Sequence, residues 1–291
     1  MRSKLAVALV LLALVLTGAP LQQRIVRQRE ALKLRVGLEG LDPDEVFTTL
    51  CMAGFRGVAV DYLWVKVLNL QFQRKWHEVR ALTELIARLQ PNFPTVWVFN
   101  AWNLAYNISV EWVPPEDQWK WVKDGLAWLD EGLRRNPGSI QIFFEKGWFF
   151  WHKISQGPSE GPRDYFRKRF LEDKELNPQG RTSYQEAAYW FRLAQIVART
   201  DDPERQHPFI GKGQMESMYY RALNAQAKEL LEAGDMAGAT KLLEEVREEL
   251  EVLRVRNGVA FPYFEEFDVD YRDVVQTLYR LNFYREMPTG S

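Results

Sequence analysis

The stretch Glu232–Leu250, EAGDMAGATKLLEEVREEL, decides the fold expected for this chain. On both sides of its Gly-Asp pair, apolar residues recur at intervals of three and four, which is the period of an amphipathic helix. Glycine takes the left-handed conformation that ends a helix, and aspartate accepts hydrogen bonds from the free amides that begin one. We therefore predict a helix over residues 213–233, a turn at Gly234 and Asp235, and a second helix over residues 236–255.

Two helices joined by so short a turn cross closely, so small side chains are expected where they meet. Ala227 and Ala239 occupy those places, between larger apolar residues one turn away. A large residue, a small one four positions later, a Gly-Asp turn and an early small residue in the next helix together resemble a tetratricopeptide repeat. The resemblance implies an all-α fold, a right-handed superhelix of antiparallel helix hairpins, or TPR-like solenoid.

The same alternation of large and small residues returns upstream, although the period is not a regular one. About four helix pairs over residues 54–256 are predicted, with insertions near 108–118 and 155–182. The irregular spacing leaves open a more general array of helical hairpins. Besides the two alanines above, the residues expected to pack the repeats are Trp97, Ala101, Gly125, Gly132, Phe143, Gly147, Ala187 and Ala194.

The two ends of the chain are expected to differ from the repeats. Residues 257–291 predict a helix that caps the last repeat, followed by a tail. Residues 1–23 start with Arg2 and Lys4 and are then apolar to Leu21, a run slightly shorter than the roughly 20 residues of a full membrane span. Small residues suit a signal peptidase, but Pro20 follows them and disfavours cleavage, so a signal anchor, a transmembrane helix, is favoured over a cleaved signal peptide.

The side of the membrane is indicated less directly. Positive residues in the juxtamembrane linker, residues 24–53, outnumber those before the apolar run, and the positive-inside rule alone would leave the body in the cytoplasm. A very short N-terminal tail that carries Arg2 and Lys4 favours the opposite orientation. We expect a single-pass protein of the inner (cytoplasmic) membrane with an extracytoplasmic body.

Composition and motifs exclude several functional classes. The 38 lysines and arginines nearly balance the 39 aspartates and glutamates, so no global field favours nucleic acid. With one cysteine, no disulfide can form within the chain. The three histidines lie far apart without a metal-binding spacing, and no nucleophile elbow or phosphate loop is present. We predict no cofactor, no metal and no catalytic residues; the acidic run in residues 264–273 is interpreted as a solvated loop.

Candidate partner-binding residues come from helical phase and from tryptophan content. Polar or aromatic residues of the expected first helices that point away from the pair contact are Asn100, Asn103, Tyr106, Glu145, Lys146 and Asn224. Trp112, Trp119 and Trp121 flank the Pro114-Pro115 insertion and could hold a partner, line a groove or lie at the bilayer surface.

The function predicted from these features is a membrane-anchored, TPR-like scaffold that mediates protein–protein interactions in the cell envelope without catalysis. Its partners are expected to be envelope proteins, and its membrane contact the N-terminal helix. The alternative is a helical glycan- or lipid-binding module, or a carboxylate-dependent glycan hydrolase, that uses the tryptophan-rich surface. A closed helical ring of the hydrolase kind needs about twelve helices, more than this chain supplies.

Overall fold

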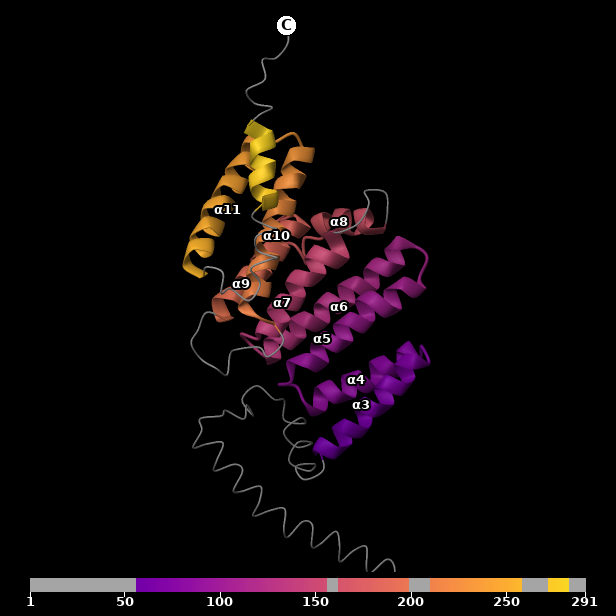
Figure 1. Cartoon of the computed structure of the whole chain (residues 1–291). Coiled ribbons are helices and arrows are strands. Elements are labelled where there is room, and N and C mark those ends of the chain that lie inside the picture. The colour runs from indigo at the N-terminus through magenta and orange to yellow at the C-terminus, as the bar shows by residue number, and fades with distance from the viewer. Residues whose placement is uncertain (1–55, 156–161, 199–209, 258–271, 283–291) are drawn as a thin grey trace, which may run out of the picture. The chain divides into compact units, whose positions relative to one another are not determined.

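The computed structural model describes residues 56–155, 162–198, 210–257 and 272–282 (Figure 1). Within these ranges every regular element is helical and there is no strand, which confirms the predicted all-α class. Contacts divide the chain into two compact units, residues 1–96 and residues 97–291.

The first unit contains one helix pair. Helices α3 (Arg56–Phe72) and α4 (Trp76–Leu89) lie side by side and are joined by a short turn. The apolar residues Val60, Val67 and Val79 are buried in this pair.

The second unit holds the remaining helices and two short stretches of unusual helix. Helices α5 and α7 each continue without a break into a π-helical segment, in which hydrogen bonds join residues five apart instead of four. The elements are α5 (Pro94–Trp102), η1 (Asn103–Ile108), η2 (Ser109–Glu111), α6 (Pro115–Arg135), α7 (Ile140–Trp148), η3 (Phe149–Ser155), α8 (Pro162–Glu172), α9 (Ser183–Ala198), α10 (Lys212–Glu232) and α11 (Met236–Asn257), followed by a helix over residues 272–282.

The turn between α10 and α11 forms as the sequence predicts. Gly234 has a positive φ of 83°, and the amide of Asp235 reaches back to the carbonyl of Leu230 at 2.9 Å, which closes the first helix. The Asp235 carboxylate accepts a hydrogen bond of 2.9 Å from the amide of Gly238 and so caps the second helix. Ala227 and Ala239 are completely buried.

Glycines allow close contact between the aromatic helices. A methyl group placed on Gly132 of α6 would lie 2.6 Å from Cβ of Trp97, and one on Gly147 of α7 would lie 2.7 Å from the ring of Phe191 in α9. Real Cβ atoms do not approach so closely, so these two positions accept only glycine at the present helix spacing. A methyl group placed on Gly125 would lie 3.0 Å from the carbonyl oxygen of Ala101.

The core of the second unit forms two clusters, and the larger one holds most of the buried aromatic side chains. Phe149, Phe166, Phe170 and Phe191 are fully buried in the larger cluster, to which α9 adds Ala187 and Ala194. Because α8 supplies two of these phenylalanines, the insertion near residues 155–182 is part of the core. The smaller cluster joins α10 and α11 to the helix over residues 272–282 through Leu243, Val246, Val274 and Leu278.

No helix in the described ranges is long and apolar enough to span a bilayer. The predicted anchor, residues 1–23, and the predicted linker, residues 24–53, lie outside the described residues.

Candidate functional site

The π-helical ends of α5 and α7 bring one carboxyl group among several rings. We call Trp102, Tyr106, Glu145, Trp148 and His152 the Glu145 cluster. Three of its members follow one another along a single helical face, at positions 145, 148 and 152, and the other two are spaced by four. All five side chains are partly exposed. π-Helical turns occur often at functional sites, because the extra residue shifts the side chains that follow it.

Hydrogen bonds and ring contacts join the two helices within the Glu145 cluster. The indole N–H of Trp102 donates to Oε2 of Glu145 at 2.8 Å, and the Trp102 ring stacks on Tyr106 with centroids 4.2 Å apart. The hydroxyl of Tyr106 lies 3.3 Å from Nδ1 of His152. His152 in turn stacks on Trp148, with centroids 5.1 Å apart and ring planes 13° from parallel.

The electrostatic state of Glu145 follows from this environment. Burial among the rings raises the pKa of Glu145 from 4.5 to about 7, and the hydrogen bond from Trp102 opposes the rise. Among the described residues, the carboxyl group of Glu145 forms no ion pair and accepts no other hydrogen bond. The cluster therefore holds a carboxyl group that changes charge near neutral pH.

A buried lysine links the two π-helical segments beside the Glu145 cluster. Lys153 of η3 is only 6% exposed, and its ammonium donates to Oγ of Ser109 at 3.1 Å. The same ammonium lies 5.0 Å from the centroid of the Tyr106 ring. These contacts fix the end of α5–η1 against the end of α7–η3 and thereby hold the rings of the cluster in place.

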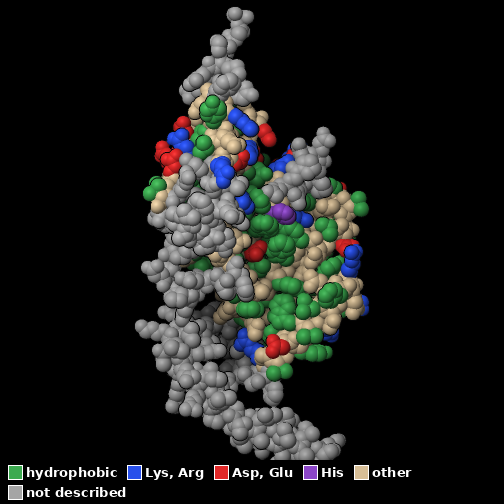
Figure 2. Space-filling view, viewed as in Figure 1, with side chains coloured by type: hydrophobic (Ala, Val, Ile, Leu, Met, Phe, Trp, Pro, Cys, Tyr) green, Lys and Arg blue, Asp and Glu red, His purple; other side chains and the backbone are tan. Residues whose placement is uncertain are grey.

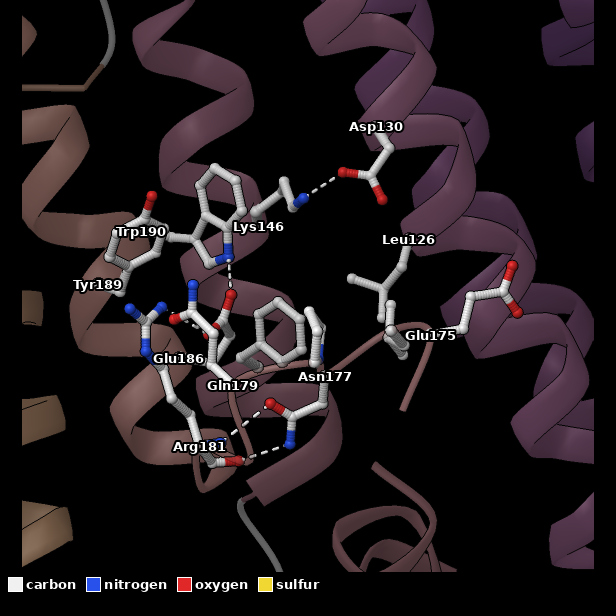
Figure 3. Close-up of a pocket in the computed structure, with 13 residues that line it drawn as sticks. Leu126, Asp130, Lys146, Glu175, Asn177, Gln179, Arg181, Glu186, Tyr189 and Trp190 are labelled. Atoms are coloured by element: carbon white, nitrogen blue, oxygen red, sulfur yellow. Dashed lines mark hydrogen bonds and ion pairs between the residues drawn. The ribbon is translucent and has the colours of Figure 1, made fainter. Parts of the chain in front are cut away.

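A pocket of about 320 Å³ opens beside α7 (Figure 3). Helices α6, α7 and α9 and the segment over residues 175–181 line it. Lys146, one of the predicted partner-binding residues, contributes its ammonium group. Figure 3 shows that this ammonium points to Asp130 of α6 and lies beside the ring of Trp190. The distance from the ammonium to the Trp190 centroid is 3.8 Å.

The charges of the pocket are already compensated within the protein. Burial lowers the pKa of the Lys146 ammonium, and the ion pair with Asp130 opposes that effect. Arg181 pairs with Glu186 at 3.1 Å and stacks on Tyr189, with its guanidinium carbon 4.3 Å from the ring centroid. A charged ligand would have to displace one of these internal partners.

The same pocket attaches the second insertion to the helices. The side chain of Asn177 donates to the Arg181 carbonyl at 2.8 Å and accepts from the Arg181 amide at 3.0 Å, which closes a compact loop (Figure 3). Asp173 pairs with Lys123 of α6 at 2.6 Å. The pocket thus lies where the second insertion is held between α6 and α9, and this attachment best explains it.

The predicted partner-binding residues lie in several places. Tyr106 and Glu145 belong to the Glu145 cluster, and Lys146 lines the pocket. Asn100, Asn103 and Asn224 are buried. Asn103 donates to the Phe99 carbonyl, and Asn224 donates to the Asp273 carboxylate. Near Pro114-Pro115, Trp119 is buried against Phe166, with ring centroids 5.7 Å apart. Trp121 is half-buried, and Trp112 is 43% exposed.

Metal-binding side chains are scattered over the ranges that the structure describes. No group of three histidine, cysteine, aspartate or glutamate side chains there could hold a metal ion. Most of the acidic run in residues 264–273 lies outside the described residues.

Trp102, Trp148 and His152 were missed as site residues by sequence reasoning. Their spacing was visible, because Trp102 precedes Tyr106 by four and both Trp148 and His152 follow Glu145 on the same face. The sequence could not show that α5 and α7 become π-helical at matching points, which brings the two faces together.

Comparison of the chain with protein-family models, curated proteins and solved structures gave no match.

Proposed function

We propose that this chain is a membrane-anchored scaffold, built from tetratricopeptide-like helix hairpins, that binds a segment of a partner protein and has no catalytic role. The observation that carries the proposal is the Glu145 cluster, a partly exposed group of rings on the first helices of two successive pairs. Tryptophan and tyrosine supply much of the binding energy at protein interfaces, because they bury a large area at a small entropic cost.

The position of the cluster supports a partner-binding surface. In a tetratricopeptide-like array, the first helices of successive pairs lie along the inner face of a right-handed superhelix, where partner segments are held. Helices α5 and α7 are such first helices in the sequence pattern, and Trp102 bonds across them to Glu145. The space-filling view shows hydrophobic side chains gathered over the stretch from α5 to α7 (Figure 2).

The cellular setting is proposed from the sequence. The apolar run within residues 1–23 would tether the body to the inner membrane, with the repeats on the extracytoplasmic side. The expected partner is then another protein of the cell envelope.

Site-specific photocrosslinking in intact membranes tests this function. A photoreactive phenylalanine at Trp151, a half-buried ring 5.4 Å from Trp148, should give a discrete adduct with one partner protein. The matched control carries the same probe at Ala127, which is exposed on α6. Equal adducts from both positions, or none from position 151, would contradict the proposal.

The hydrolase alternative has one observation in its favour. A carboxyl group with a pKa of about 7 suits a general acid, and Glu145 has that value. Glycoside hydrolysis needs a second carboxyl group about 5–10 Å away. Turnover of a bacterial glycan by the purified chain, abolished in Glu145→Gln, would favour this alternative over the scaffold.

A further inference from the structure

We propose that the Glu145 cluster binds a lysine ammonium group of the partner protein, between the Glu145 carboxylate and the neighbouring aromatic rings. This inference rests on the proposed function and adds the chemistry that the surface recognises. It follows from three features of the described residues, namely a carboxyl group without a cation, the rings around it, and a comparable site that is already filled.

The first feature is the missing counter-ion. Burying a carboxylate is costly unless a cation or several hydrogen bonds compensate it, and Glu145 receives only the indole N–H of Trp102 among the described residues. The cations of the adjoining elements have other contacts. Lys146 binds Asp130, Lys153 binds Ser109, and Arg192 binds Gln195. Other charged or titratable groups on the elements packed around α7 are Tyr106, Asp130, Arg134, His152, Arg181 and Glu186.

The second feature is the set of rings. The faces of tryptophan and tyrosine attract an ammonium group, and a nearby carboxylate strengthens the attraction. Trp148, one turn along α7 from Glu145, also has its indole N–H buried without a hydrogen-bond partner among the described residues. A segment that inserts a lysine here would bring main-chain carbonyl groups able to accept from this N–H.

The third feature is a filled counterpart formed by the next residue of the same helix, Lys146. There the ammonium of Lys146 lies 3.8 Å from the centroid of Trp190 and pairs with the Asp130 carboxylate. The Glu145 cluster also combines indole rings with a carboxyl group, and the ammonium nearest to its rings, that of Lys153, lies against Tyr106 and donates to Ser109. The fold thus already accommodates a buried lysine beside an indole and a carboxylate, the surroundings that the cluster would offer to a partner.

Binding of a cation should be linked to the release of a proton. Below pH 7 the carboxyl group of Glu145 is mostly protonated, because burial raises its pKa to about 7. An ammonium group favours the ionised form, so the proton must leave on binding. The affinity should therefore fall about tenfold for each pH unit below 7 and remain level between pH 7 and 9.

A titration of the full-length protein in detergent micelles tests the inference. The probe is Nα-acetyl-lysine methylamide, whose single charge is the side-chain ammonium, and the neutral counterpart carries an acetylated Nε. Tryptophan fluorescence and the NMR signals of the indole N–H groups report binding between pH 5.5 and 8.5. The variants are Glu145→Gln and, as a control of equal charge change, Glu175→Gln, which removes a carboxylate that is 91% exposed.

We expect the lysine probe to bind at least about tenfold more tightly than its acetylated counterpart at pH 8. Glu145→Gln should remove this preference and the pH dependence, whereas Glu175→Gln should keep both. Equal binding of the two probes, or a pH profile that survives in Glu145→Gln, would overturn the inference. Tighter binding of glycerophosphoethanolamine than of the lysine probe would also overturn it, because the site would then suit a lipid headgroup.

The crosslinking experiment separates the two proposals. An adduct from position 151 together with failure of the lysine titration would leave the scaffold function standing and remove only the ammonium site. Lysine binding without any adduct would keep the site and remove the protein-scaffold function.

Discussion

The α10–α11 hairpin and the aromatic pairs α5–α6 and α7–α9 use different means to bring helices together. In α10–α11 a three-residue connection and two buried alanines, Ala227 and Ala239, are sufficient, and both helices remain α-helical to their ends. The aromatic pairs instead need glycine at their crossings and end their first helices in π-helix. The comparison shows that a large aromatic side chain at a helix crossing requires glycine on the facing helix.

The reason is volume. Trp97 fits against α6 only because position 132 has no side chain, and Phe191 fits against α7 only because position 147 has none. An alanine-packed hairpin has no such requirement. The surfaces differ in the same way, since charged side chains gather around α11 and hydrophobic ones over the stretch from α5 to α7 (Figure 2).

The largest expected effect comes from substitutions that disrupt the α10–α11 hairpin. Changing Ala227 and Ala239 together to leucine inserts side-chain volume at two fully buried positions and should lower the free energy of unfolding by about 4 kcal/mol. Chemical denaturation followed by circular dichroism measures it. Ala237→Leu, at an exposed position of α11, is the matched control and should change stability by less than about 0.5 kcal/mol. Unchanged stability in the double variant would show that these helices do not cross at the alanines.

A pH-dependent effect separates the aromatic pairs from the regular hairpin. The pKa of Glu145 is about 7 in the folded protein, whereas its usual value of 4.5 applies to the unfolded chain. Between pH 4.5 and pH 7 the folded state therefore binds more protons than the unfolded state. Stability should therefore fall as pH rises from about 4.5 to 7 and be level above. Glu145→Gln removes this slope and should stabilise the protein by about 3 kcal/mol at pH 8.

Denaturation midpoints at pH 5 and pH 8 provide the measurement for Glu145→Gln. Glu244→Gln, on an exposed part of α11, is the control, because it removes a carboxyl group that is not buried. If both variants shift the two midpoints alike, the carboxyl group of Glu145 is solvated and the electrostatic account of the cluster is wrong.

The smallest expected effect is one that the two regions should share. Gly138, before α7, and Gly234, before α11, have φ values of 82° and 83°, and neither would bring a Cβ within 4 Å of another group. Alanine at either place should cost about 1 kcal/mol through backbone strain alone. Thermal denaturation of the two single variants compares them, and a cost confined to one turn would show that the regions also differ in their connections.

The sequence predicted the regular features better than the aromatic ones. The turn at Gly234 and Asp235 follows from local chemistry, because glycine and aspartate act on their own backbone. Asn100 and Asn103 were assigned to a surface by a constant helical phase, yet both are buried. Asn224 in the regular hairpin is buried as well, because helical phase shows which face a residue occupies but not which neighbouring helix covers that face.

The candidate site was predicted only in part. Tyr106 and Glu145 were chosen, but burial is what raises the pKa of the Glu145 carboxyl group, and its hydrogen-bond donor, Trp102, is 43 positions away along the chain. Nor could the sequence show that Lys146, adjacent to Glu145, turns to a different pocket. Adjacent residues on a helix point in directions about 100° apart, and which neighbour each meets is decided by tertiary packing.

The insertion that contains α8 has a consequence for the order in which the helices come together. Helices α10 and α11 meet after closing a loop of three residues, whereas α7–η3 and α9 must close a loop that includes all of α8. Loop-closure entropy grows with the logarithm of length, so the second closure costs about 2 kcal/mol more. The C-terminal hairpin can consequently form early from local contacts, while the ring-lined face around Glu145 is completed only when distant parts of the chain have been joined.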